Sequence, residues 1–143
     1  MNKGGVTPYP LAMVVCDAVC RDSAGKLTLV GTFGLIAATD FPAKHPAFTI
    51  YVSLTDGHGI VRLRVQLVDT DEQREPVFEI DGEVSFEDPR AVHEICFEIK
   101  NIVIPAPGEY RLKLFANNEF LIERRIVVVG PNDAHEQRES DEP

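Results

Sequence analysis

The stretch Phe48-Thr-Ile-Tyr-Val-Ser-Leu54 decides the fold class of this chain, because large apolar residues alternate along it with Thr, Tyr and Ser. Successive side chains of a β-strand point to opposite faces, so the pattern predicts a strand with one buried face. The segment Thr55-Asp-Gly-His-Gly59 then offers turn residues, and the alternation resumes over residues 61–67. We therefore predict a β-hairpin from these two stretches.

Outside this hairpin, period-2 alternation recurs between turn signals, and the sequence shows no helical periodicity. The segment 22–26, which contains the turn residues Asp22 and Gly25, and the pair Asn117-Asn118 each predict a further hairpin. Gly82 is interpreted as a β-bulge. The pattern indicates an all-β fold, an antiparallel β-sandwich of about eight strands. The strands are expected at residues 11–21, 27–38, 48–54, 61–67, 77–86, 94–100, 110–116 and 120–129.

The length of 143 residues, with 44% hydrophobic and 26% charged residues, is typical of one globular domain that folds without a disulfide or a metal. We expect a flexible N-terminus over residues 1–8, a β-sandwich domain over residues 9–130 and a disordered acidic tail over residues 131–143. The reason is the content of Gly, Pro and charge at the two ends. No apolar run approaches the roughly 20 residues that a transmembrane helix requires.

The formal net charge is −9 at pH 7. Nucleic acids and anionic membranes are bound by clustered Lys and Arg, so this charge disfavours both as partners. Three cysteines are present, and Cys16 and Cys20 lie four residues apart on one expected strand. Strand rise separates them by about 13 Å, which is too far for a disulfide. We expect reduced thiols and a cytoplasmic location.

The sequence shows no pattern of catalytic or metal-binding residues. A phosphate-binding loop needs a glycine-rich turn that leads into a helix, but Asp56-Gly-His-Gly59 leads into an expected strand. His93 and Cys96 are three residues apart on a strand, so they point to opposite faces and cannot form a local nucleophile–base pair. The cysteines and histidines lack the spacing of zinc ligands. We expect no catalytic residue, no cofactor and no metal.

Polar loop residues form the first candidate site. If the strands run alternately up and down, four of the connections lie at one end of the sandwich. A ligand or a cation would then meet carboxylate, imidazole and amide groups from several loops. The alternative is that these loops are polar because they are exposed. The candidate residues are Asp22, Asp56, His58, Asp88 and Asn117.

Outward aromatic residues form the second candidate site. Tyr51 and Phe115 both fall among the polar positions of expected strands. Gathered together, such residues form an apolar patch suited to a protein partner or to a second copy of the chain. Taken singly, exposed apolar residues are common and need no functional explanation.

The chain resembles a bacterial family of uncharacterised single-domain β-sandwich proteins, a domain of unknown function, over about residues 11–129. The resemblance implies a fold, but no activity, substrate or catalytic residue. The stretches that carry it are Val14-Val-Cys-Asp17, Arg21-Asp22, Gly25-Lys26, Phe41-Pro42, Tyr51-Val-Ser-Leu-Thr-Asp-Gly57, Pro107-Gly-Glu-Tyr110, Ala116-Asn117 and Glu123-Arg-Arg125.

The segment Pro105-Ala-Pro-Gly-Glu-Tyr110 is also similar to the start of a strand in many immunoglobulin-like sandwiches, where a tyrosine anchors the corner. This similarity implies an immunoglobulin-like architecture with Tyr110 as the anchor, although the chain lacks the Trp of true immunoglobulin domains. We infer a non-catalytic protein-interaction or scaffolding module whose partner is an unknown protein or a second copy in a homodimer. The alternative function is a ligand- or cation-binding domain that uses the loops at one end.

Overall fold

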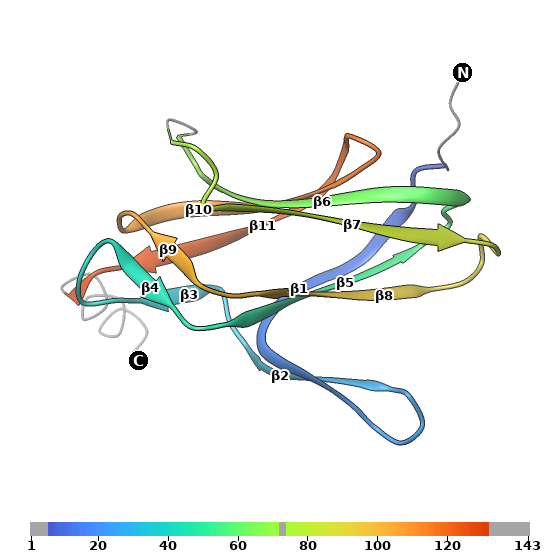
Figure 1. Ribbon diagram of the computed structural model, residues 1–143, viewed down its shortest axis with the longest axis horizontal. Coiled ribbons are helices and arrows are strands. Elements are labelled where there is room, and N and C mark those ends of the chain that lie inside the picture. Colours follow the sequence, from blue (N-terminus) through green and yellow to red (C-terminus); the bar gives the residue numbers. More distant parts are fainter. Residues whose placement is uncertain (1–5, 72–73, 132–143) are drawn as a thin grey trace, which may run out of the picture.

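A computed structural model describes residues 6–71 and 74–131, and all the elements that it assigns there are strands (Figure 1). The predicted all-β class is therefore confirmed. The described residues contain eleven strands, where about eight were expected. Their bounds are β1 (Tyr9–Arg21), β2 (Leu27–Thr32), β3 (Leu35–Ala37), β4 (Ala43–His45), β5 (Phe48–Thr55), β6 (Gly59–Asp69), β7 (Phe78–Phe86), β8 (His93–Ile99), β9 (Ile102–Ile104), β10 (Gly108–Ala116) and β11 (Glu119–Val129).

The strands form two large sheets that lie one above the other in Figure 1, and a small third one. The first has four strands in the order β2-β1-β5-β8, and the second has five in the order β3-β11-β10-β6-β7. The pair β4-β9 makes the third, and it joins two segments that were expected to be loops. These short strands were missed because three residues are too few to show a period-2 pattern.

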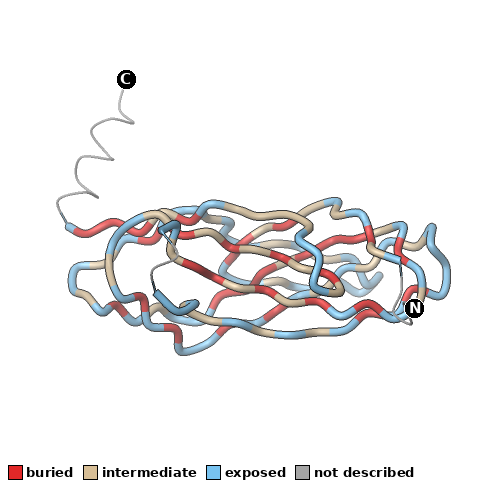
Figure 2. Tube along the Cα trace, turned by 90° about the horizontal axis from the view of Figure 1, so that it is seen from above, coloured by how far each residue is buried: buried red, intermediate tan, exposed pale blue. Residues whose placement is uncertain are grey.

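The core lies between the two large sheets, and β5 shows why. Phe48, Ile50, Val52 and Leu54 are at most 1% exposed, and they belong to one buried cluster with side chains of β6 and β10. Figure 2 shows buried positions recurring along the strands. Full burial of each such side chain stabilises the fold by about 1.5–3 kcal/mol relative to leaving it exposed.

The predicted hairpin of β5 and β6 is wrong, although both strands are present. β5 pairs with β1 and β8, whereas β6 pairs with β10 and β7 in the other sheet. The connection between them therefore crosses from one sheet to the other. Gly57 is needed there because a Cβ atom would lie 2.6 Å from the ring of Phe86.

The expected strand over residues 27–38 is divided between the two sheets. β2 pairs with β1, and the strand is interrupted at Phe33 and Gly34. β3 then pairs with β11 in the parallel direction. The prediction assumed antiparallel strands throughout, but the second sheet contains this one parallel pair. Phe33 packs against the core at this crossing, and the burial of its ring favours the path of the chain from the first sheet to the second.

Two predicted hairpins are confirmed. Gly25 closes the β1–β2 turn with a φ of 86°, and β1 and β2 then pair in register. Asn117 and Asn118 join β10 to β11 with φ values of 50° and 68°, the left-handed region in which Asn is tolerated.

Tyr110 anchors a corner, as predicted. Its side chain is 1% exposed, and its hydroxyl donates a hydrogen bond of 2.6 Å to the carbonyl oxygen of Ala106, four residues upstream. Burial raises the pKa of this hydroxyl, so it remains a hydrogen-bond donor throughout the neutral range. The bond fixes the path by which the chain enters β10.

The predicted ends of the domain fall partly on the described residues. Within the segment expected to be flexible, the amide of Val6 donates to the carbonyl oxygen of His58 at 2.8 Å, so the chain pairs locally before β1 begins. Residues 1–5 and 132–143 lie outside the described residues. Among the described residues no helix is long and apolar enough to cross a membrane.

Gly82 is not the bulge that the sequence suggested. β6 and β7 pair without interruption, with Gly82 opposite Leu63. A Cβ atom at this position would instead lie 2.9 Å from the ring of Phe97, which belongs to β8 in the opposite sheet. The glycine therefore makes room for an aromatic ring that bridges the two layers.

We predict that Gly82→Ala lowers the free energy of unfolding by about 1–3 kcal/mol, because the methyl group overpacks the site. Adding Phe97→Leu should make the alanine less costly than it is beside Phe97, which a double-mutant cycle by urea denaturation measures. Additive effects of the two substitutions would contradict this explanation of the glycine.

Candidate interaction site

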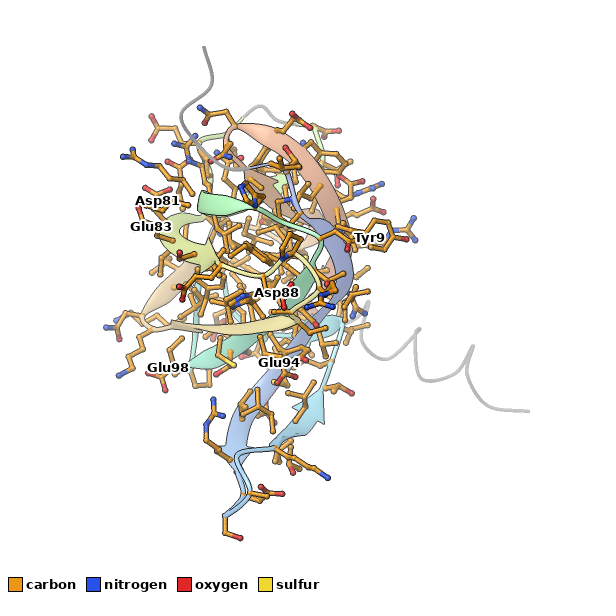
Figure 3. All side chains as sticks on the ribbon, turned by 90° about the vertical axis from the view of Figure 1, so that its right-hand side faces the viewer. Tyr9, Asp81, Glu83, Asp88, Glu94 and Glu98 are labelled. Atoms are coloured by element: carbon orange, nitrogen blue, oxygen red, sulfur yellow. The ribbon has the colours of Figure 1, made fainter. Side chains whose placement is uncertain are left out.

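The structure brings several of the predicted loop residues to one end of the molecule, which faces the viewer in Figure 3. The amide of Asp56 donates to the carbonyl oxygen of Pro89 at 2.8 Å, which joins the β5–β6 connection to the loop that carries Asp88. Asn117 lies at the same end because its backbone and side chain bond the backbone of Arg62 in β6. His58 stands in the same connection as Asp56.

Asp22 does not join them, which corrects the prediction. It begins the turn at the tip of the β1–β2 hairpin, where its carboxylate accepts the amides of Ala24 and Lys26, both at 2.9 Å. The start of β1 pairs with the end of β5, so β1 carries the chain away from Asp56. In Figure 3 the hairpin tip lies at the bottom, far from Asp88. The expectation failed because β1 is long and curls out of its sheet.

The loop residues also have roles within their own turns. Asp88 accepts the amide of Arg90 at 3.0 Å and both of its guanidinium contacts at 3.2 Å, and these bonds hold the pKa of the carboxyl below its usual range. The side-chain oxygen of Asn117 accepts the amide of Arg62 at 3.0 Å. Among the described residues no group of three or more His, Cys, Asp or Glu is placed to hold a metal ion.

Tyr51 and Phe115 lie on opposite outer faces and do not form one surface. Tyr51 is in the middle of the four-stranded sheet, where its hydroxyl donates to Glu94 of the neighbouring strand. Phe115 is in the five-stranded sheet and packs edge-on against Phe120, with 6.0 Å between ring centroids. The sequence could not separate the two, because alternation shows that a residue points outward but not from which sheet.

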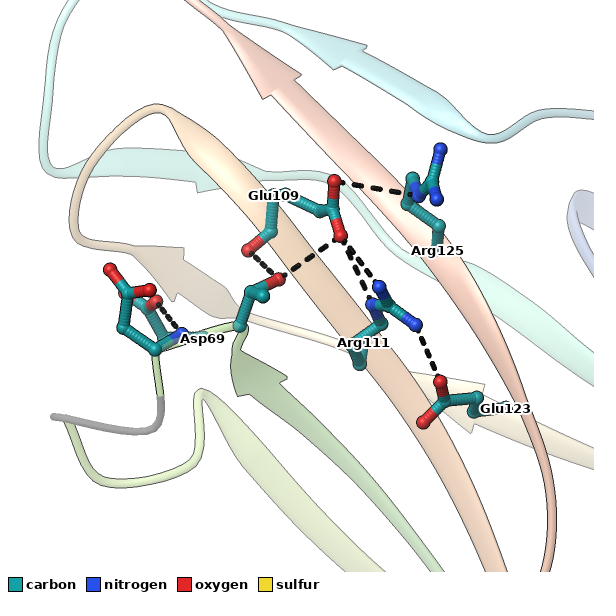
Figure 4. A network of polar contacts seen from close by, with 7 residues as sticks. Asp69, Glu109, Arg111, Glu123 and Arg125 are labelled. Atoms are coloured by element: carbon teal, nitrogen blue, oxygen red, sulfur yellow. Dashed lines mark hydrogen bonds and ion pairs between the residues drawn. The ribbon is translucent and has the colours of Figure 1, made fainter.

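Charged side chains of the five-stranded sheet neutralise one another on its outer face (Figure 4). Arg111 donates to Glu109 at 2.9 and 3.1 Å and also to Glu123, and Glu109 has a second ion pair with Arg125 at 3.4 Å. These two carboxylates raise the pKa of the Arg111 guanidinium. The charged groups on this part of the face are thus already paired with one another within the sheet.

His93 and Cys96 point to opposite faces of β8, as predicted. The imidazole of His93 packs edge-on against Phe86 of the core, with 4.4 Å between the ring centroids. Cys96 is exposed on the other side of the strand, opposite Tyr51. The two side chains therefore do not make a nucleophile–base pair.

A groove of about 400 Å³ lies between the curled β1–β2 hairpin and the outer face of β5 and β8. Its lining is mixed in character and includes Arg21, Leu27, Thr49, Cys96 and Glu98. The hairpin is therefore an arm that stands off the sheet, as Figures 1 and 3 both show.

The arm leaves one edge strand of six residues, β2, without a charged residue. β2 has the sequence Leu-Thr-Leu-Val-Gly-Thr. It is the edge strand of its sheet and pairs with β1. Most of its residues are exposed, and Val30 is 45% exposed. The backbone N–H and C=O groups on the open side of such a strand are a template for another strand.

The other edges of the large sheets are protected. β7 carries Glu79, Asp81 and Glu83 along its length, and β8 carries Glu94 and Glu98. β3, the remaining edge, is only three residues long. Charge and short length are the usual means by which proteins prevent edge pairing, so β2 is the exception.

The sequence reasoning missed this site, although one signal was present. Residues 27–32 are uncharged and rich in β-branched and aliphatic residues, which is typical of a strand that pairs readily. The same pattern also fits a central strand with neighbours on both sides. Only the sheet order shows that it lies at an edge.

A family model described as a family of unknown function, DUF6941, matches residues 11–129. The chain belongs to this family. The match extends over β1 to β11, so every strand considered above lies wholly or mostly within the DUF6941 domain. Comparison with curated proteins gives no significant match.

The three cysteines of this DUF6941 domain are free thiols in different surroundings. Cys16 is buried in β1 where this strand lies between β2 and β5, and its thiol donates a hydrogen bond of 3.7 Å to the carbonyl oxygen of Thr49. Cys20 and Cys96 are exposed. Burial raises the pKa of Cys16, and loss of solvent raises that of Cys96. A raised thiol pKa means less reactive thiolate at neutral pH.

We predict that Asp56→Ala lowers the free energy of unfolding by about 1 kcal/mol relative to Asp56→Gly, because the φ of this residue is 63° and alanine is strained there. His58→Ala should change it by less than about 0.5 kcal/mol, since the residue is exposed. Urea denaturation of the three variants measures both effects. Equal stability of the alanine and glycine variants would argue against strain at this turn.

We predict that brief alkylation of the native protein labels Cys20 first and Cys96 more slowly, and that Cys16 reacts only after unfolding. The order follows from the burial of Cys16 and the raised pKa of Cys96. Mass spectrometry without reductant reads the sites. Labelling of fewer than three thiols in denaturant would show a disulfide.

Proposed function

We propose that this protein is a non-catalytic protein-interaction module that binds an extended strand of its partner along the open edge of β2. The observation that carries the proposal is the contrast between β2, whose six residues are mostly exposed and uncharged, and the charged or very short strands at the other edges. Strand addition to an exposed edge is a common mode of protein recognition.

The hydrogen-bond pattern of the hairpin indicates which backbone groups would bind the partner. The amide of Asp22 donates to the carbonyl oxygen of Lys26 at 2.9 Å, which makes these two residues a hydrogen-bonded pair. Such pairs alternate along an antiparallel ladder, so Thr28 and Val30 turn their backbone groups toward β1. The backbone groups of Leu27 and Leu29 then point to the open side and are available to an added strand.

The proposed architecture is an immunoglobulin-like β-sandwich. Two observations support it: the core packed between two large sheets, and the buried Tyr110 whose hydroxyl bonds the backbone four residues upstream. In such sandwiches the scaffold is rigid and recognition is carried by loops or edges. A projecting edge strand is consistent with that division of roles.

The proposed location is the cytoplasm. Three free cysteines, two of them exposed, support a reducing compartment, because exposed thiols oxidise readily elsewhere. A bacterial source for the chain likewise remains a prediction from the resemblance.

A matched pair of valines tests the proposed edge. Val30 in β2 and Val103 in β9 are 45% and 47% exposed, so replacing either by lysine makes the same chemical change at similar exposure. We predict that Val30→Lys reduces recovery of a partner from native extract at least tenfold, because a charged edge blocks strand addition. Val103→Lys should bind like the unchanged protein.

Both variants should retain the melting temperature within a few degrees, because neither valine belongs to the buried core. Equal partner recovery by the two lysine variants would refute binding at β2.

A further inference from the structure

We propose that the strand added to β2 is β2 of a second copy of this chain, antiparallel to the first across a two-fold axis. The four-stranded sheets of the two copies would then join into one continuous sheet. This inference rests on the proposed function, which requires only that some strand is added at this edge.

The charge distribution favours a second copy at this place. The net charge of −9 makes two copies repel one another over most of their surfaces. Along residues 16–32, which span the arm, the acids Asp17 and Asp22 are balanced by Arg21 and Lys26, and β2 itself has no charge. The arm is therefore a part of the surface at which identical chains meet without net repulsion.

The shape of the arm is suited to edge pairing. In Figures 1 and 3 the β1–β2 hairpin projects beyond the two stacked layers, so its open edge is not shielded by the rest of the domain. The backbone groups of Leu27 and Leu29 point to this side, as the alternation of the ladder requires. Identical antiparallel strands satisfy each other's donors and acceptors reciprocally.

Two-fold pairing also closes the assembly. An uncharged edge that pairs in a head-to-tail manner would extend without limit, whereas an antiparallel pair of identical edges consumes both at once. The other edges of the joined sheet would be the two copies of β8, each protected by Glu94 and Glu98, and the end of β1 beyond its pairing with β5, which carries Asp17 and Arg21. The dimer therefore leaves no unprotected long edge in that sheet.

The test is sedimentation equilibrium of the full chain. The monomer mass is 15.9 kDa, and we expect a reversible transition to twice that mass. One strand pair is small for an interface, so the protein should be studied from about 1 to 500 µM. Val30→Lys should shift the transition to at least tenfold higher concentration, and Val103→Lys should leave it unchanged.

Hydrogen exchange of the individual amides identifies the paired edge. At concentrations that favour the dimer, the amides of Leu27 and Leu29 should become protected, while those of Thr28 and Val30 should stay as they are. The same amides in Val30→Lys should exchange at the monomer rate. A dimer in which Leu27 and Leu29 remain unprotected would place the contact elsewhere and overturn the inference.

The outcomes separate this inference from the proposed function. A chain that stays at 15.9 kDa over the whole range overturns self-pairing. If such a monomer still loses its partner through Val30→Lys, the edge binds a strand of another protein and the proposed function stands. If neither association nor partner recovery depends on Val30, both proposals fail.

Discussion

The structure depends on one constraint: alternate side chains of both large sheets must meet in a single core. β5 is an example, since Phe48, Ile50, Val52 and Leu54 are all buried between the layers, and alternate residues of β6 and β10 are buried as fully. A shift of one residue in the pairing of this strand would move all four to the outer face. The register of the neighbouring strands, and with it the direction of the connections, follows from this burial.

Bridges between the layers complete the core at its margins. The ring of Phe97 reaches across from β8 to the backbone of Gly82 in β7. On the opposite side, Arg124 of β11 donates a hydrogen bond of 2.9 Å to the carbonyl oxygen of Met13, in a part of β1 that lacks β2 as a neighbour. The first contact is apolar packing, and the second gives the Met13 carbonyl oxygen a side-chain donor.

The outer surfaces differ because the core does not constrain them. On the five-stranded sheet Arg111 and its carboxylate partners are paired within the sheet. Acidic residues along β7 and β8 oppose pairing with another strand, whereas β2 has no charged residue. An exposed edge without charged residues offers its backbone groups to another strand, and β2 presents such an edge on a projecting arm.

The sequence by itself determined the all-β class, most strand positions and two of the hairpins, because alternation and turn chemistry are local properties. Asn117-Asn118 and Gly25 are examples, and Tyr110 was identified as an anchor by its similarity to known corners. Only the tertiary structure decided which strands share a sheet, that Asp22 lies apart from Asp56, and that Tyr51 and Phe115 face opposite ways. The physical reason is that a strand's pattern records that one face is buried, while its neighbours and its exposed edge depend on residues distant in the chain.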